Sequence, residues 1–144
     1  MRVKLLADDT ERTFALIFDV GDEVMSLLGR FAAERRPRSA HFTAIGAFSD
    51  AVLAYFDWET KKYREIPVDE QVEVLTLAGD IAWREDGEPV VHAHVVVGRS
   101  DGTTRGGHLK AAHVRPTLEL ILIESPRHLE RRHDPETGLA LIRV

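Results

Sequence analysis

The feature that most constrains the fold is a long region of β-strand pattern, from about residue 41 to residue 97. Short runs of β-type residues, such as "VEVLTLAGDIA", are separated by turn residues, which we place at Ser49-Asp50, Glu59-Thr60 and Asp86-Gly87. Spacings this short favour antiparallel neighbours, because a parallel pair needs a long crossover connection. Two later segments, "PTLELILIES" and "GLALIRV", add further strands, for a total of about seven or eight.

One segment near the start of the chain changes to helical spacing. In "DVGDEVMSLLGRFAAERR" the apolar residues recur at intervals of three and four, at Val24, Leu27, Leu28 and Phe31. Asp22 is the expected N-cap, and the helix should end before Pro37, because proline disfavours the α conformation in the residue before it. The sequence therefore predicts an α+β fold: a single domain over residues 1–144, with a mostly antiparallel sheet and one main amphipathic helix.

Composition narrows the possible functions. The 144 residues include no cysteine, so any metal ion must be bound by His, Asp or Glu. The 19 Lys and Arg against 24 Asp and Glu give a net charge of −5, which argues against a broad nucleic-acid surface on one subunit. The first residues lack the apolar core of a signal peptide, and no run reaches the length of a membrane span. We therefore expect a cytoplasmic protein without membrane association.

Three histidines interrupt the valine-rich segment "PVVHAHVVVGRSDGTTRGGHL", residues 89–109. Side chains alternate along a strand, so His92 and His94 project from the same face and can reach one ion. With His108 they would form a three-imidazole site, which suits Zn²⁺ or another divalent metal and leaves a fourth position open for water or a small-molecule ligand. On spacing alone, three ordinary histidines are an equally good interpretation.

The position of His108 depends on the register of this hairpin. A two-residue turn centred on Asp101-Gly102 would pair Val95 with His108 and send His108 to the opposite face. One extra residue in the returning strand would pair His108 with His94 instead, and we predict a bulge at Gly106 and Gly107 for this purpose. Alternatively, the strand ends at Gly106 and His108 enters from a loop. Without side chains, the two glycines also let the backbone approach a ligand or a neighbouring strand closely.

Other ionisable residues are weaker candidates. Glu119, a lone carboxylate in the apolar run "TLELIL", is either a base for a metal-bound water or a solvent-facing strand residue. His113 could approach the same site, although a surface position suits it better. His128 and His133 lie in the charged run "SPRHLERRHDPETG", which we expect to be an exposed loop.

The chain resembles the plants-and-prokaryotes conserved domain family, or PPC domain. The resemblance is carried by four segments in the family's order: "HFTAIGAFSDAVLAYFD", "VEVLTLAGDIA", "HAHVVVGRSDGTTRGGHL" and "PTLELIL". It implies an α+β fold assembled as a homotrimer, whose prokaryotic members often carry a metal, commonly zinc. The family's metal-binding histidines correspond to His92, His94 and His108.

The resemblance also suggests competing functions. Plant members follow AT-hook segments in nuclear DNA-binding proteins, and prokaryotic members are often labelled as DNA-binding. This sequence has no Arg-Gly-Arg-Pro hook; the nearest segment, "ERRPRS", has Arg36 where the glycine would be. We therefore favour a metal-binding homotrimer of unestablished biochemical role, with DNA binding only weakly supported by the acidic charge. The alternative is a metal-dependent hydrolase or lyase that acts on a small molecule.

Overall fold

A single nine-stranded sheet dominates the computed structural model, which describes residues 1–8, 11–125, 127 and 129–143. Within these residues the chain forms one α-helix. In chain order the elements are β1 (Arg2–Asp8), β2 (Arg12–Phe18), α1 (Val24–Arg35), β3 (Ala40–Asp57), β4 (Lys62–Val68), β5 (Val72–Arg84), β6 (Pro89–Gly98), β7 (Thr104–Glu124), β8 (Glu130–His133) and β9 (Ala140–Arg143). The predicted α+β class with one helix is confirmed.

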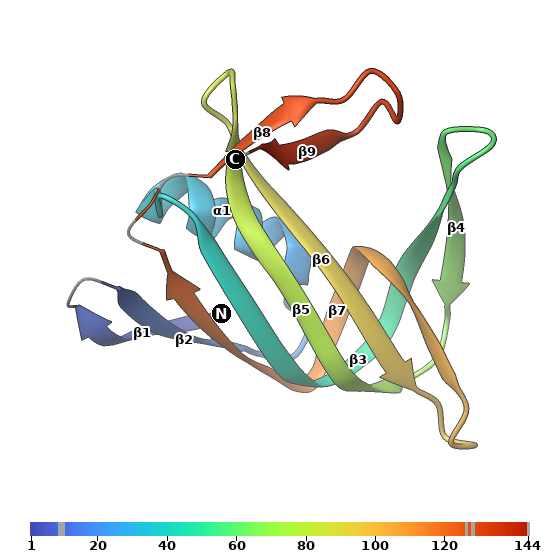
Figure 1. Ribbon diagram of the computed structural model, residues 1–144. Helices are drawn as coiled ribbons and strands as arrows, with labels where there is room; N and C mark the ends of the chain where they lie inside the picture. The colour runs from blue at the N-terminus through green and yellow to red at the C-terminus, as the bar shows by residue number, and fades with distance from the viewer. Residues whose placement is uncertain (9–10, 126, 128, 144) are drawn as a thin grey trace.

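Four strands of the sheet close into a ring (Figure 1). β3 pairs with β5, β5 with β6, β6 with the first part of β7, and β7 with β3, all antiparallel. β2 and β1 extend the sheet beyond the second part of β7, and β4 pairs with the end of β3. The β8–β9 hairpin is attached to β5 through the one parallel pairing among the described strands. The sheet is therefore mostly antiparallel, as predicted.

Two strands are longer than their sequence patterns indicated. The turn predicted at Ser49-Asp50 is wrong: β3 continues through these residues, and its pairing with β7 shifts register between Phe48 and Asp50. The segment "PTLELILI" is the second half of β7 rather than a separate strand. At these positions the polar residues lie where the pairing within one strand is irregular. In the sequence, such residues cannot be told apart from those of a turn.

The helix begins one residue later than its predicted cap implied. Glu23, not Asp22, is the N-cap, and its carboxylate accepts hydrogen bonds from the backbone N–H of Met25 (3.2 Å) and Ser26 (2.6 Å). Asp22 instead forms an ion pair with the amino group of Met1, at 2.6 Å. The helix ends at Arg35, as the proline rule predicted.

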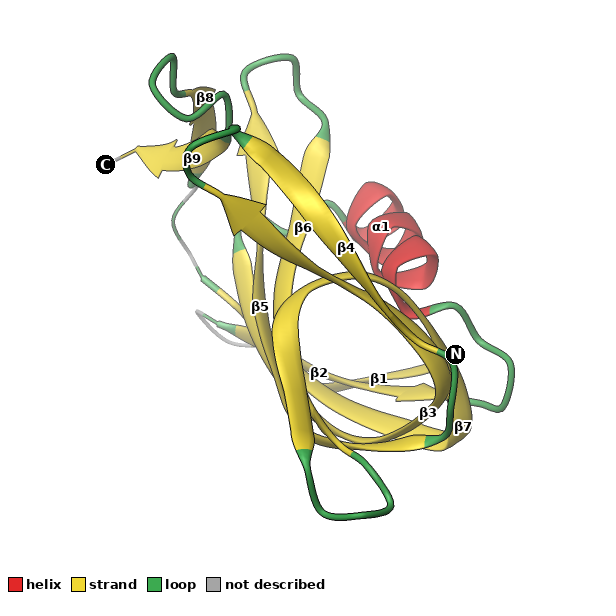
Figure 2. Ribbon diagram, turned by 90° about the vertical axis from the view of Figure 1, so that its right-hand side faces the viewer, coloured by secondary structure: helices red, strands yellow, loops and turns green. Residues whose placement is uncertain are grey.

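The core lies between the helix and one face of the sheet. The helix packs against β6 and β7 on this side (Figure 2). The predicted inward face of β2 is confirmed, since Phe14, Leu16 and Phe18 are buried. On β6 the odd-numbered residues from Ala93 to Val97 are buried in the same core. The even-numbered residues of β6, including His92 and His94, therefore face the opposite side of the sheet.

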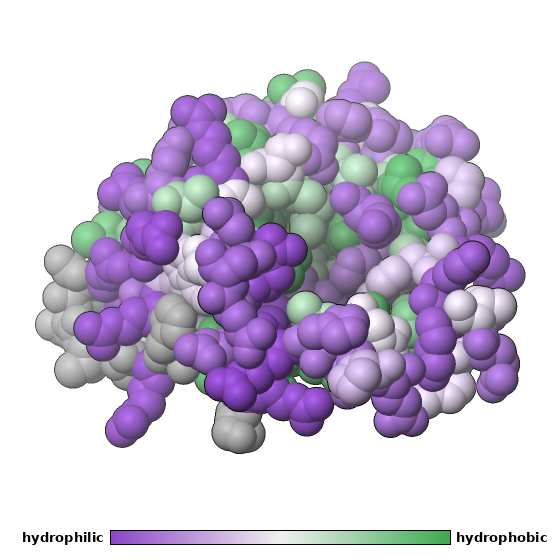
Figure 3. All heavy atoms as spheres, turned by 90° about the horizontal axis from the view of Figure 1, so that it is seen from above, coloured by the Kyte–Doolittle hydropathy of each residue, from purple (hydrophilic) through white to green (hydrophobic). Residues whose placement is uncertain are grey.

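The surface seen from above is mainly hydrophilic, with hydrophobic residues exposed near the middle of the view (Figure 3). Among the described residues, no helix combines the length and the apolar character needed to cross a membrane.

Candidate metal centre

The hairpin formed by β6 and β7 sets the position of the third histidine. His94 lies directly opposite His108, and the pairing continues through Val95 with Gly107 and Val96 with Gly106 without a register shift. The predicted pairing of His94 with His108 is therefore confirmed. The bulge predicted at Gly106 and Gly107 is wrong, because the strands are regular there.

The extra residue that sets this register lies in the turn. The backbone N–H of Gly102 donates to Arg99 O (2.9 Å), and the N–H of Arg99 donates to Thr103 O (2.8 Å). Gly102 has a φ of 80°, which a residue with a side chain rarely adopts. The hairpin is therefore a three-residue loop in which a type I turn is followed by a left-handed glycine. The loop is one residue longer than the two-residue turn assumed from the sequence, and it moves His108 onto the face of His94.

Gly107 allows the close strand approach that the sequence indicated. A Cβ atom added there would lie 2.7 Å from the carbonyl oxygen of Ala54 on β3. Ala54 is also the residue paired with His108 across the β3–β7 ladder. The absence of a side chain at Gly107 thus lets β3 support β7 at the point where it carries His108.

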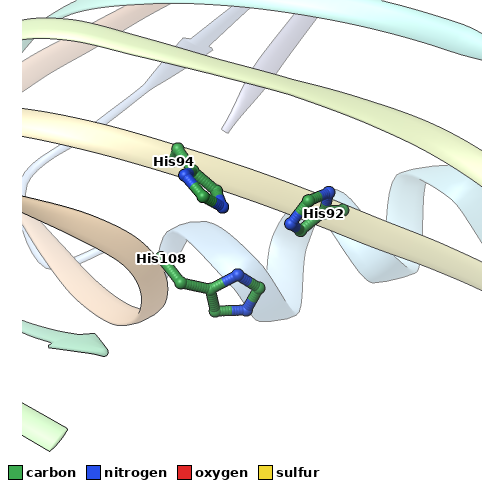
Figure 4. A group of neighbouring side chains, drawn as sticks. All are labelled: His92, His94 and His108. Atoms are coloured by element: carbon green, nitrogen blue, oxygen red, sulfur yellow. The ribbon is translucent and has the colours of Figure 1, made fainter. Parts of the chain in front are cut away.

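The three histidines form one cluster (Figure 4). Each offers a ring nitrogen, and the three nitrogens lie within 4.8 Å of one another. The ring centroids are 5.0 Å apart for His92 and His94, 5.1 Å for His92 and His108, and 5.5 Å for His94 and His108. In a tetrahedral shell, two nitrogens bound to one ion at about 2.0–2.1 Å lie about 3.3–3.4 Å apart, so ring rotations that bring the three nitrogens closer together would complete the set.

The electrostatics of the cluster favour neutral imidazoles. Burial, together with the nearby His92, His94 and Lys110, lowers the pKa of His108 to about 4. Burial and the neighbouring His92 also lower the pKa of His94. Neutral imidazole is the form that binds a metal, so at neutral pH these two ligands have no proton to displace.

His108 also has a buried polar atom that finds no protein partner. Its Nδ1 is buried and neither donates nor accepts a hydrogen bond within the described part of the chain. A buried polar atom without a partner is costly, and in native proteins it usually has an explanation such as a bound ion or water. The three imidazoles and the unpartnered nitrogen fit a divalent metal with nitrogen ligands.

Asp80 on β5 is a site residue that sequence reasoning missed. It pairs with His92 across the β5–β6 ladder, and its Oδ2 lies 3.5 Å from His92 Nδ1. Burial opposes ionisation of this carboxyl, but the contacts from His92 and Arg131 outweigh it and hold the pKa of Asp80 below its usual value. The available signal was a lone carboxylate in the apolar run "LAGDIAW".

An aromatic side chain covers another side of the cluster. The ring centroid of Tyr63 on β4 lies 5.0 Å from that of His108. The ammonium group of Lys110 lies 5.7 Å from the centre of the Tyr63 ring, and Phe56 packs edge-on against the same ring. These contacts limit the rotation of His108 and place a cation beside the cluster.

The remaining candidates lie elsewhere. Glu119 is exposed on the second half of β7, and the strands β3 and β5 separate it from β6. The exposed His113 is hydrogen-bonded through its Nδ1 to Asp50 Oδ1 at 2.8 Å, and it lies outside the cluster. His133 is exposed at the end of β8, where an exposed loop was expected, and His128 lies outside the described residues.

Comparison with known proteins supports the resemblance. The model of the Plants and Prokaryotes Conserved (PCC) domain, the PPC family, matches residues 6–126. A relative, the bifunctional protein GlmU of Synechococcus sp. (strain JA-3-3Ab), is 34% identical over 131 residues. That match covers 88% of this chain but 20% of the relative, so this chain spans about a fifth of the relative's length.

Solved structures share this fold over 91–100% of the chain. A metal-containing protein from Archaeoglobus fulgidus is 32% identical, with a TM-score of 0.84 over 100% of this chain and 99% of that one. A plant- and prokaryote-conserved protein from Pyrococcus horikoshii is 29% identical, with a TM-score of 0.84 over 99% and 95%. A "putative DNA-binding protein" from Ralstonia eutropha JMP134 is 30% identical, with a TM-score of 0.83 over 91% and 90%. From the match over residues 6–126 and this shared fold, the chain belongs to the Plants and Prokaryotes Conserved domain family.

Proposed function

We propose that this chain is a metal-binding protein that holds one divalent ion, zinc in the first instance, through His92, His94 and His108. The observation that carries the proposal is the convergence of three ring nitrogens within 4.8 Å on one face of the sheet. The Archaeoglobus fulgidus structure, described as metal-containing, supports it from a relative of the same fold. A chain without cysteine has imidazole as its best donor for such an ion.

Different residues of the chain would have different roles at such a centre. The three imidazoles would hold the ion, the hairpin turn at Gly102 keeps them on one face, and Tyr63 packs against His108. A bound zinc ion would supply Lewis acidity and a coordination position open to water or a small molecule. The neighbouring Lys110 favours an anionic ligand at that position.

Metal titration of the purified protein tests the proposal. After treatment with a chelator, calorimetric titration with zinc should show one ion bound per chain, and elemental analysis of the reloaded protein should give the same ratio. Zinc should also raise the thermal unfolding temperature, because it binds the folded state preferentially. A protein that takes up no zinc, cobalt or nickel under these conditions would refute the proposal.

We also propose that the chain assembles as the homotrimer that its family implies. An apolar surface lies on the same sheet face as the histidines, where Ile45, Leu75 and Ile121 are 62%, 52% and 43% exposed. Ile45, Ile121 and Glu119 line a hollow of about 370 Å³ on this surface. A second copy of this chain would remove these side chains from water.

The substitution Ile45→Glu should break such an assembly. It places a charge in the apolar surface without disturbing the core, because Ile45 is exposed in the single chain. Light scattering coupled to size-exclusion chromatography should give a trimer for the unmodified protein and smaller species for the variant. The exposed Glu65→Gln on β4 serves as the control, and a monomeric unmodified protein would contradict the proposal.

The two competing functions have weaker support. A hydrolase or lyase needs a proton-transfer group beside the metal-bound water, and Glu119 lies two strands away within one chain. It could serve as a base only from a neighbouring copy.

DNA binding is suggested by the printed names of relatives from Ralstonia eutropha and Bacteroides thetaiotaomicron. A net charge of −5 per chain opposes it, because affinity for DNA depends on neutralising phosphates.

A further inference from the structure

The C-terminal hairpin makes a specific contact with the surroundings of the histidines. β8 and β9 form an antiparallel pair, and β8 attaches to the end of β5 through Trp83 with Glu130 and Arg84 with Arg131 (Figure 1). The family match ends at residue 126, so the hairpin lies outside the matched segment. It attaches to β5, the strand that carries Asp80.

Arg131 connects this hairpin to Asp80. Its side chain is 6% exposed, its Nη2 donates to Asp80 Oδ1 at 2.5 Å, and its Nη1 donates to the carbonyl oxygen of Ala140 at 2.9 Å. A buried guanidinium is costly unless its charge is paired, and Asp80 supplies that pairing. The carboxylate is thus held in one orientation by a group that is itself fixed by β9.

The fixed carboxylate faces a metal ligand. With Oδ1 occupied by Arg131, the other oxygen, Oδ2, lies 3.5 Å from His92 Nδ1. An acceptor at this position favours a proton on Nδ1, which leaves the lone pair of Nε2 free for an ion. Neither His94 nor His108 has a carboxylate partner of this kind among the described contacts.

We infer that Arg131 is a positioning residue for the metal centre: it fixes Asp80, and Asp80 selects the Nδ1-protonated tautomer and the ring orientation of His92. The C-terminal hairpin then contributes to metal affinity without touching the ion. This inference rests on the proposed metal site. Removing a group that orients a metal-binding histidine typically weakens metal binding by about 10–100-fold.

The test compares Arg131→Met with Arg132→Met in the full-length protein. Methionine keeps much of the side-chain length of Arg131 but removes its charge and its donors. Arg132 is a matched control on the same strand: it is 57% exposed and pairs with Glu85 and Glu130 rather than Asp80. Zinc affinity, measured by competition with a chromophoric chelator, should fall about 10–100-fold for Arg131→Met and stay unchanged for Arg132→Met.

A second measurement separates positioning from simple stabilisation. Long-range proton–nitrogen NMR of the metal-free protein reports the tautomer of His92. The unmodified protein and Arg132→Met should show Nδ1-protonated His92, whereas Arg131→Met should show a mixture of both tautomers. If Arg131→Met does not fold, Arg131→Lys retains the charge, but one ammonium group cannot replace both guanidinium contacts, so the same loss is expected.

The outcomes distinguish this inference from the proposed function. A folded Arg131 variant with unchanged zinc affinity and an unchanged His92 tautomer would overturn the inference, even if its unfolding temperature fell. An unmodified protein that binds no zinc would refute the metal site, whereas the tautomer comparison would still test the link from Arg131 to His92.

Discussion

His94→Ala is expected to abolish stoichiometric zinc binding. His94 lies directly opposite His108 and beside His92, so its loss leaves two imidazoles and no other donor within reach in the described cluster. The side chain is exposed, so the fold should tolerate the change. At a zinc concentration of 100 times the dissociation constant, the unmodified protein should gain about 2.7 kcal/mol in free energy of unfolding. The variant should gain none.

His113→Ala is the matched control for this experiment. His113 is exposed, pairs with Asp50 and lies outside the cluster, so the variant should bind one zinc ion per chain like the unmodified protein. Calorimetric titration and thermal unfolding with and without zinc measure both proteins. Full zinc binding by His94→Ala would show that the three-histidine assignment is wrong.

Gly107→Ala is expected to destabilise the protein and weaken the metal site together. The new Cβ would lie 2.7 Å from the carbonyl oxygen of Ala54, which belongs to the backbone and cannot rotate away. Separating β7 from β3 at this point would cost about 1–3 kcal/mol in free energy of unfolding. Because Ala54 pairs with His108, the same displacement should move the third imidazole and lower zinc affinity.

Gly106→Ala provides the comparison at the neighbouring residue. There the nearest atom to an added Cβ is the carbonyl oxygen of Val95 at 3.2 Å, and Gly106 is exposed. Chemical denaturation and chelator competition should therefore show a smaller loss than for Gly107→Ala in both stability and zinc affinity. Equal effects of the two substitutions would argue against a specific role for the approach of β3 at Gly107.

Much of the fold follows from periodicity. Alternation identified the buried face of β2, and spacings of three and four identified α1, because each pattern reflects burial on one side of a regular element. The continuity of β3 and β7 could not be predicted in the same way. A strand that bends through an irregular pairing has the polar residues of a turn, and long-range pairing determines which of the two forms.

The part of the candidate site formed by residues close together in the sequence was predictable. Strand alternation placed His92 and His94 together, and the hairpin placed His108 near them once its register was known. Asp80 and Arg131 were not predictable, because 51 positions separate them in the sequence and the β5–β8 pairing brings them together. The register itself depended on a left-handed glycine in the turn, Gly102, rather than on the two glycines next to His108.

The three-residue turn between β6 and β7 has a consequence for how this family can vary in length. Four residues of each strand lie between the His94–His108 pair and the turn, residues 95–98 on β6 and residues 104–107 on β7. Residues inserted in or deleted from the turn itself leave these pairs intact, so both imidazoles stay on one face. One residue inserted in a single strand, between the turn and its histidine, shifts the pairing and moves that imidazole to the opposite face unless a bulge absorbs it. Relatives that retain both histidines should therefore vary in the length of this loop while keeping equal numbers of residues between each histidine and the loop.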